Sequence, residues 1–372
     1  MNQKEKLLVL IGPTAVGKTK LSIELAQSFN GEIISGDSMQ VYRGMDIGTA
    51  KITPAEMAGT PHHLIDIKNP DEPFSVKEFQ ELVREKIAEI ASRGKLPMIV
   101  GGTGLYIQSV IYDYQFSEAP SDSKFRTELE QRVAKGYSED LYQELQKIDP
   151  TSAEKIHPNN VRRVIRALEI YHCTGKTMSD YQQHQELGHL FDTCLIGLTM
   201  DRDQLYERIN LRVKLMMEEG LVDEVKALHI AGLRNCQSIQ AIGYKELYDF
   251  LDGKVTIDEA VESLKQNSRH YAKRQLTWFR NKMNVEWFDM SATADTYEKK
   301  FADISGFIEG KLKTRNWEDQ NGVKRYQTEI IANNLQMLGS KGEADSSSSP
   351  EDFGDSDFPP AEDQNKESDL PF

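Results

Sequence analysis

Apolar and polar positions alternate in blocks along the first hundred residues, and each block has the length of one strand or one helix. The apolar run 7–11 is typical of a strand buried on both faces. Apolar residues recur at helical spacing in 21–26 and in 74–90, and short apolar runs follow each helical block at 32–36 and 97–100. The alternation predicts an α/β fold, with a parallel sheet flanked by helices.

The alternation stops in the middle of the chain, where the sequence turns polar and helical, with pieces at 128–133 and 139–148. Strand and helix patterns return from residue 194 to about residue 308. We therefore expect an all-helical domain inserted into the α/β core. The predicted divisions are 1–111, the first part of the core; 112–190, the inserted domain; 191–308, the second part of the core; 309–340, a hairpin; and 341–372, an acidic disordered tail.

Composition places the chain among globular proteins. It has 372 residues, of which 38% are hydrophobic and 28% charged, enough for two domains with a large core. The N-terminal apolar run is too short for a signal peptide and no run approaches a membrane span, so we expect a cytoplasmic protein. Cys173, Cys194 and Cys236 form no C-x-x-C pair, which argues against a disulfide framework and a zinc site. We expect them to be buried apolar residues.

The negative charge is concentrated at the end of the chain. Residues 341–372 carry −8 of the formal net charge of −14, which leaves −6 for the other 340 residues. The body is therefore not strongly acidic, and local basic clusters remain compatible with nucleic-acid binding.

The segment after the first strand matches the phosphate-loop pattern G-x-x-x-x-G-K-[ST] between a strand and a helix. Glycines let the backbone turn its N–H groups inward, and the following helix N-terminus favours an anion. The lysine adds a mobile cation, and the threonine hydroxyl is a ligand for magnesium. The predicted diphosphate-binding residues are Gly12, Pro13, Thr14, Ala15, Val16, Gly17, Lys18 and Thr19.

Asp37 follows the second strand and should lie near the phosphate loop, because ligands of α/β sheets bind beyond the carboxyl ends of the strands. The equally weighted alternative is that Asp37 only caps a turn. The third strand ends in Gly101-Gly102-Thr103 without a carboxylate. This argues against an ATPase or GTPase, which needs an acidic residue there, and suggests that a substrate group approaches the glycine backbone closely.

Two helical segments carry basic residues on one face. Arg162, Arg163 and Arg166 lie within five residues of one another, and contact with a polyanion is about as probable as a solvated helix face. Arg269, Lys273 and Arg280 form a second stripe, for which a phosphate backbone is favoured over a face that serves solubility alone.

The combined motifs resemble bacterial tRNA dimethylallyltransferases from the N-terminus to about residue 308. The matching segments are 12–19, 37–51, 61–63, 101–103, 157–159, 166–169, 243–244 and 273–278. The resemblance implies a fold like that of P-loop kinases, and a reaction with dimethylallyl diphosphate and tRNA. The dimethylallyl group would be transferred to N6 of the adenosine 3′-adjacent to the anticodon, with release of pyrophosphate.

The resemblance also implies roles for individual residues. Asp37 would take the proton of the exocyclic amine, while Lys18, Arg212 and a magnesium ion on Thr19 stabilise the leaving pyrophosphate. Thr103 would contact the target nucleotide and completes the predicted catalytic set. The implied tRNA-binding residues are Asp37, Ser38, Met39, Gln40, Thr103, Arg126, Arg162, Arg163, Val164, Ile165, Arg166, Gln240, Gly243, Tyr244, Lys245 and Lys273. A monomer is expected.

Residues 311–372 resemble instead the C-terminal part of bacterial single-stranded DNA-binding protein. An Asn-Gly turn between two strand-like runs predicts a hairpin, which is too little for that protein's five-stranded barrel. The acidic segment is expected to be disordered, and its last four residues, 369–372, resemble a partner-recruiting tail.

Two rival functions stay open at this point. A small-molecule kinase would use the same loop to hold ATP. A non-enzymatic protein would act through its C-terminal tail by recruiting a protein partner.

Overall fold

The computed structural model describes residues 4–114, 122–183, 188–234, 236–291, 296–313, 315–318 and 324–327. Within these residues a six-stranded sheet has the order β3-β2-β4-β1-β5-β6, and every pair of neighbouring strands is parallel. The strands are β1 Lys6–Ile11, β2 Gly31–Gly36, β3 His62–His63, β4 Leu96–Gly101, β5 Asp192–Thr199 and β6 Glu286–Asp289. The α/β fold with a parallel sheet is confirmed.

The helices of the core follow the strands along the chain. They are α1 Lys18–Ser28, α2 Val76–Ser92, α3 Gly104–Ile111, α9 Arg202–Glu218, α10 Leu221–Ile230, α11 Tyr244–Leu251, α12 Ile257–Lys282 and α13 Tyr297–Lys313, with a short 3₁₀ turn η1 at Ser238–Gln240. Capping residues determine where several of these helices begin. The Ser75 hydroxyl accepts the Glu78 N–H at the start of α2, and Thr256 and Glu259 form a capping box at the start of α12.

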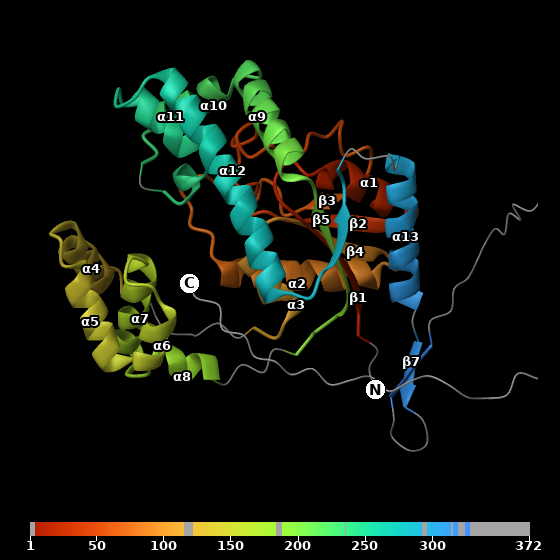
Figure 1. Cartoon of the computed structure of the whole chain (residues 1–372), viewed down its shortest axis with the longest axis horizontal. Helices are drawn as coiled ribbons and strands as arrows, with labels where there is room; N and C mark the ends of the chain where they lie inside the picture. Colours follow the sequence, from red (N-terminus) through yellow and green to blue (C-terminus); the bar gives the residue numbers. More distant parts are fainter. Residues whose placement is uncertain are drawn as a thin grey trace, which may run out of the picture. The chain divides into compact units, whose positions relative to one another are not determined.

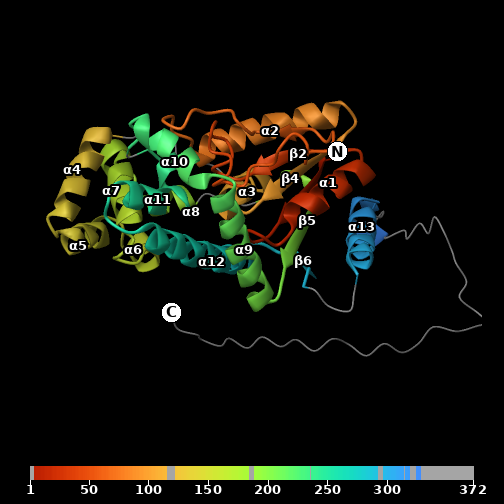
Figure 2. The same cartoon turned by 90° about the horizontal axis from the view of Figure 1, so that it is seen from above.

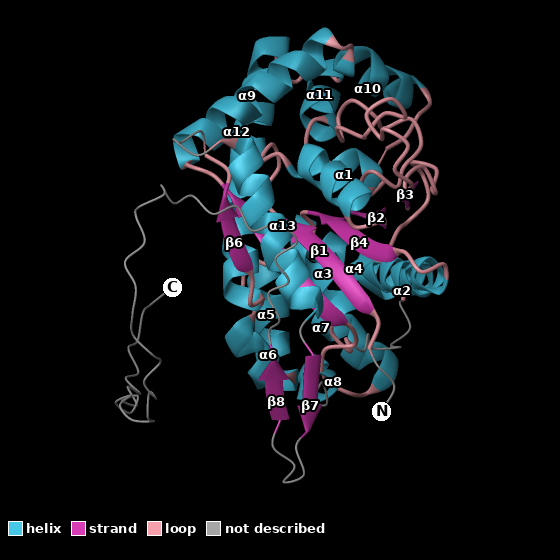
Figure 3. Ribbon diagram, turned by 90° about the vertical axis from the view of Figure 1, so that its right-hand side faces the viewer, coloured by secondary structure: helices cyan, strands magenta, loops and turns pink. Residues whose placement is uncertain are grey.

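The central strand β1 is buried on both faces of the sheet, which explains why the run 7–11 is entirely apolar. Leu7, Val9 and Ile11 pack on one face of the sheet with α2, α3 and the helices α10–α12. Leu8 and Leu10 point to the other face, toward α1, α9 and α13. Figure 3 shows the strands of the sheet in the middle of the view with helices around them, and Figures 1 and 2 both place α13 beside α1. Both faces are buried, as the run predicted.

The inserted segment folds into helices with their own core. They are α4 Ser123–Ala134, α5 Ser138–Ile148, α6 Pro150–Lys155, α7 Val161–Thr174 and α8 Met178–Gln183. Leu129, Leu141, Leu145 and Leu168 pack together within it. A bridge between Tyr112 and His189 joins the two points at which the chain leaves and rejoins the core. The predicted helices at 128–133 and 139–148 are confirmed as α4 and α5.

The predicted hairpin is present as strands β7 Arg315–Glu318 and β8 Lys324–Gln327, which pair antiparallel. Its turn and the acidic tail at 341–372 lie outside the described residues. Among the helices that the structure describes, none is long and apolar enough to cross a membrane.

The cysteine prediction holds for one residue of three. Cys194 on β5 is fully buried, whereas Cys173 and Cys236 are partly exposed. All three are free thiols.

Candidate active site

The loop between β1 and α1 closes tightly at its two glycines. Gly17 has φ 108°, a conformation that L side chains rarely adopt, and α1 starts at the next residue. A Cβ on Gly12 would lie 2.9 Å from the Leu198 carbonyl oxygen of β5. The glycines therefore let the loop turn beside β5 and direct the N-terminus of α1 at the space above the sheet.

Lys18 is held against this loop rather than extended into solvent. Its ammonium donates to the carbonyl oxygens of Gly12 at 2.9 Å and Pro13 at 2.8 Å. Desolvation, together with the charge of Arg212, lowers the pKa of Lys18 to about 7, although Asp37 acts in the opposite direction. The loop thus presents a cation whose charge an incoming anion would stabilise.

Arg212 reaches the loop from α9, 198 residues further along the chain. Its guanidinium donates to the Thr14 hydroxyl at 3.4 Å, and its burial lowers its pKa, again against the effect of Asp37. Within the described residues, neither Arg212 nor Lys18 has a carboxylate within ion-pair distance. Two cations therefore line the same cavity, and among the described residues no carboxylate forms an ion pair with either of them.

Asp37 lies just beyond the end of β2 and caps a turn with one of its oxygens. Oδ1 accepts the N–H groups of Met39 at 2.7 Å and Gln40 at 3.3 Å. The Thr103 hydroxyl accepts the Ser38 N–H at 3.3 Å, which joins this turn to the end of β4. Asp37 therefore does cap a turn, and its carboxylate also lines the cavity described next.

A cavity of about 410 Å³ opens above the carboxyl ends of the strands. It brings together predicted site residues from four separate stretches of the chain: Thr14, Lys18, Thr19, Asp37, Ser38, Met39, Gln40, Arg212, Gln240, Gly243 and Lys245. Apolar side chains line it as well, among them Ile52, Ile65, Ile209, Val213 and Met216. It therefore joins a cationic and an apolar surface beside one carboxylate.

Comparison with known proteins gives this site a context. The sequence model of the family described as IPP transferase matches residues 40–282. A tRNA dimethylallyltransferase of Geobacillus thermodenitrificans is 62% identical over 309 residues, covering 83% of this chain and 98% of that protein. The chain belongs to the IPP transferase family.

Other relatives agree with this assignment. A tRNA dimethylallyltransferase of Bacillus cereus is 61% identical over 314 residues, covering 84% of this chain and 98% of that protein. The crystal structure of the Bacillus halodurans tRNA isopentenylpyrophosphate transferase has a TM-score of 0.64 and 57% identity, covering 83% of this chain and 97% of its own. The structure of a eukaryotic dimethylallyltransferase acting on tRNA has a TM-score of 0.70 and 30% identity, covering 87% of this chain and 92% of its own.

A second family model, that of the single-strand binding protein family, matches residues 253–338 of this chain. The match bears out the resemblance seen at the C-terminal end, but it begins earlier than the predicted residue 311. Residues 257–282 within it form α12, which contributes Gln275 to the cavity. In the part of the chain that the structure describes, this region pairs only two strands outside the main sheet.

The arginines of the inserted segment differ from Arg212 of the cavity in their charged partners. Arg126 and Arg166 both pair with the buried carboxylate of Glu169, at 2.8 and 2.7 Å. Arg162 and Arg163 are exposed on α7. Any tRNA contact by Arg126 and Arg166 would therefore use side chains that already hold an internal ion pair.

Three of the predicted tRNA-binding residues have buried side chains. Val164 and Ile165 pack in the core of the inserted helices. Tyr244 is fully buried, and its hydroxyl donates to Glu224 at 2.6 Å. Any tRNA contact by these three residues would therefore have to use their backbone atoms, and their assignment to the tRNA interface stays a prediction.

Some of the basic side chains on α12 already have partners within the protein. Lys273 is exposed on α12, in the stripe that also held Arg269 and Arg280. Arg269 instead donates to Asn210 at 2.7 Å and pairs with Glu262 at 3.3 Å, and Arg280 lies over the ring of Trp287. The stripe is therefore not a row of free cations.

Packing within the protein accounts for the two glycines at the end of β4. A Cβ on Gly101 would lie 2.4 Å from backbone atoms of Gly36, and one on Gly102 would lie 2.1 Å from the Gln275 amide nitrogen. Both glycines line the cavity, and contacts within the protein already disfavour a side chain: the Gly36 backbone excludes one at Gly101, and the Gln275 amide would have to move at Gly102. The sequence-based explanation, close approach of a substrate, is not needed.

Gln275 and Tyr271 on α12 were missed as site residues. The Gln275 amide accepts the Thr14 N–H at 3.0 Å and donates to the Gly102 carbonyl at 3.0 Å, so it joins the loop to β4. Burial and the charge of Asp37 raise the pKa of Tyr271 to about 12. The Lys-Arg-Gln motif at 273–275 was an available signal, but the sequence does not indicate that its glutamine faces the phosphate loop.

Proposed function

We propose that this chain is a tRNA dimethylallyltransferase, which transfers the dimethylallyl group of dimethylallyl diphosphate to N6 of the adenosine 3′-adjacent to the anticodon. One observation carries the proposal: Lys18, Arg212 and Asp37 line one cavity in a chain 62% identical to a tRNA dimethylallyltransferase. The cations suit a diphosphate, the carboxylate suits an amine that must lose a proton, and the apolar wall suits a branched five-carbon group.

The reaction follows from these positions. The adenine N6 attacks the allylic carbon, the C–N bond forms as the C–O bond breaks, and pyrophosphate leaves with the bonding electrons. The loop amides, Lys18 and Arg212 stabilise the charge that develops on the leaving group. Asp37 accepts the N6 proton. Because an aromatic amine is a weak nucleophile, positioning of the base contributes much of the rate.

A magnesium ion fits this site in the manner usual for substrate phosphates. In phosphate-loop proteins the Ser or Thr hydroxyl of the loop binds Mg²⁺, which also has phosphate oxygens and water as ligands. The Thr19 hydroxyl lines the cavity in the first turn of α1 and is the protein ligand that we assign. Bound there, the ion would neutralise part of the diphosphate charge.

We extend the proposal to partners and location. The tRNA would use exposed Arg162, Arg163 and Lys273 for phosphate contacts and Gln240 and Lys245 at the cavity rim. The target base must leave its stack to enter the cavity, which costs least in the single-stranded anticodon loop. A tRNA substrate also favours a cytoplasmic location and is compatible with a monomer.

Substitution of Asp37 by asparagine tests the proposal and separates the two roles of this residue. Asparagine retains Oδ1, which caps the turn, but it cannot accept the N6 proton. We expect single-turnover transfer of a labelled dimethylallyl group to an unmodified anticodon stem-loop to fall by about 10²–10⁴-fold, with unchanged tRNA affinity.

Asp37→Ala serves as the companion variant because it removes cap and base together. Wild-type rates in Asp37→Asn combined with a low rate in Asp37→Ala would reduce Asp37 to a turn cap. Absence of transfer by well-folded wild-type protein would overturn the proposed function, and turnover of ATP with a phosphoryl acceptor would then favour the kinase.

A further inference from the structure

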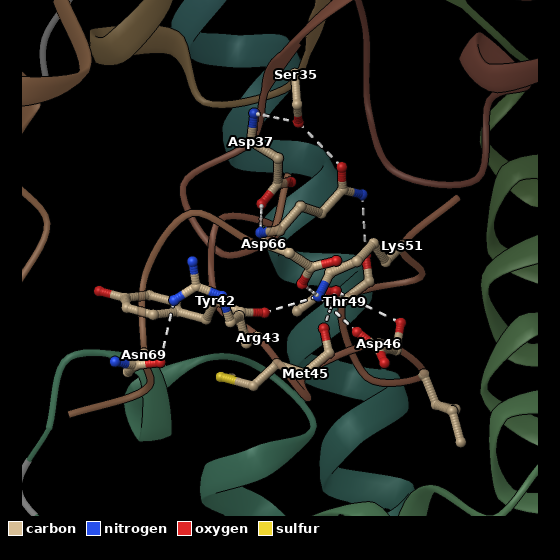
Figure 4. A network of polar contacts seen from close by, with 12 residues as sticks. Ser35, Asp37, Tyr42, Arg43, Met45, Asp46, Thr49, Lys51, Asp66 and Asn69 are labelled. Atoms are coloured by element: carbon tan, nitrogen blue, oxygen red, sulfur yellow. Dashed lines mark hydrogen bonds and ion pairs between the residues drawn. The ribbon is translucent and has the colours of Figure 1, made fainter. Parts of the chain in front are cut away.

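The segment 46–51 has no regular secondary structure, yet it lines the cavity at Gly48, Thr49 and Ala50. Lys51 fixes its far end with a side chain only 5% exposed. The ammonium donates to the Tyr42 carbonyl at 2.7 Å and pairs with Asp46 at 2.5 Å and Asp66 at 2.6 Å (Figure 4). A wall of the cavity is therefore fixed by side chains rather than by strand or helix hydrogen bonds.

The near end of the segment is held by a carboxylate from α10. Glu224 Oε2 accepts the N–H groups of Asp46 and Ile47, both at 2.8 Å, and Oε1 accepts that of Gly48 at 3.0 Å. Oε1 also accepts the Tyr244 hydroxyl at 2.6 Å. Four donors thus satisfy one carboxylate, which fixes three consecutive peptide units.

Tyr244 packs its ring directly against this turn. A Cβ on Gly48 would lie 2.5 Å from the Tyr244 ring, so only glycine fits there. Burial and the neighbouring Glu224 raise the pKa of Tyr244, which keeps its hydroxyl protonated as a donor. Glu224 and Tyr244 therefore act together on one turn from two different helices.

The hydrogen bonds continue from this turn to Asp37. The Gln40 amide nitrogen donates to the carbonyls of Thr49 at 3.3 Å and Ala50 at 3.4 Å. Its oxygen accepts the Ser35 hydroxyl at 3.0 Å, and the Gln40 N–H donates to Asp37 Oδ1. Figure 4 shows Ser35 and Asp37 at one end of this network and Thr49 at the other.

We infer that Glu224 is a positioning residue for the transfer reaction: through the turn 46–48 and Gln40 it sets the orientation of the Asp37 carboxylate. The inference rests on the proposed function of Asp37. Glu224 itself does not line the cavity and contacts no substrate in this assignment. Tyr244 is the first residue of α11 and follows Gly243, which lines the cavity. The hydrogen bonds from Tyr244 through Glu224 and Gln40 therefore connect the start of α11 to Asp37.

Glu224→Gln tests this inference, since it conserves shape but presents an amide N–H₂ to backbone donors. We expect the single-turnover rate at saturating tRNA and dimethylallyl diphosphate to fall about tenfold or more, as for losses of supporting hydrogen bonds around an active group. The affinity for pyrophosphate should stay within about twofold, because the loop 12–19 is untouched. Asp223→Asn is the matched control: it removes the neighbouring, exposed acid from the same first turn of α10 and should leave the rate unchanged.

Combination with Asp37→Asn distinguishes positioning from general stabilisation. If Glu224 acts through Asp37, Glu224→Gln should cause no further loss of rate in the Asp37→Asn background. The same fold-loss in both backgrounds, or a wild-type rate in the single variant, would overturn the inference.

Tyr244→Phe provides a second route if Glu224→Gln does not fold. It keeps the ring against Gly48 and removes only the hydroxyl donor, so a smaller loss with the same dependence on Asp37 is expected. An effect of Tyr244→Phe that is independent of Asp37 would equally contradict the inference. Failure of the proposed function itself is recognised separately, by the absence of transfer in the wild type.

Discussion

The cations of the cavity and the cations of the inserted helices differ in what balances their charge. Lys18 and Arg212 lie in a partly desolvated cavity, and their pKa values are lowered. Arg126 and Arg166 lie on the surface of the insert, 44% and 35% exposed, and both pair with the fully buried Glu169.

The difference shows how to distinguish a binding cation from a structural one. A desolvated cation without a paired acid raises the free energy of the folded protein, and a bound anion relieves that cost. A cation paired with a buried acid is already stabilised and gains less from a ligand. Arginine content alone does not separate these two cases.

Among the variants that test this comparison of cations, Arg212→Gln should have the largest effect. If Arg212 stabilises the leaving pyrophosphate as proposed, removing its charge should lower the transfer rate by about 10²–10³-fold. The free energy of unfolding, measured in urea, should stay the same or rise, because an unpaired desolvated charge is lost.

The contrasting variant is Glu169→Gln in the insert. It leaves Arg126 and Arg166 without their acid and should lower the free energy of unfolding by about 1–2 kcal/mol. If Arg212→Gln were the more destabilising of the two variants, the distinction between binding and structural cations would fail.

Deprotonation of Lys18 should weaken the binding of pyrophosphate by up to tenfold per pH unit above about pH 7. Its pKa is lowered from 10.5 to about 7, so at pH 8 most of the free protein has lost this proton. An anion binds better to protonated Lys18. The contribution of Lys18 to the affinity should therefore be constant below about pH 7 and fall above it, approaching tenfold per unit for one proton taken up.

Calorimetric titration in two buffers of different ionisation enthalpy measures that proton uptake directly. The Lys18→Met variant should bind pyrophosphate weakly, and its binding should take up no proton. The same substitution should also remove a stability term that rises with pH between about 7 and 10.5, where the unfolded chain still holds the proton. Equal proton uptake by the variant would assign the titration to another group.

The smallest effect is expected from the exposed arginines of α7. If Arg162 and Arg163 contact tRNA phosphates, their joint replacement by alanine should weaken tRNA binding and reduce its salt dependence. The slope of log K against log salt should become less steep by about 0.7–0.9 per lost contact. Pyrophosphate affinity serves as the internal control and should not change, and an unchanged slope would remove both residues from the interface.

The sequence alone determined those features that depend on neighbouring residues. The fully apolar β1 predicted burial on both faces, and the glycine spacing of residues 12–17 predicted the turn that leads into α1. The place of Asp37 after β2 predicted its position at the carboxyl edge of the sheet. Each of these follows from local geometry, because strand and helix periods and glycine conformations are set within a few residues.

Only the tertiary structure decided which distant groups meet. Arg212 lies beside Thr14 across 198 positions, and Glu224 binds the turn at Gly48 across 176. The buried side chains of Val164, Ile165 and Tyr244, and the pairing of Arg126 and Arg166 with Glu169, were equally invisible in the sequence. A periodic pattern gives the apolar face of a helix, but the packing of the whole core decides which element covers that face and which charges are paired.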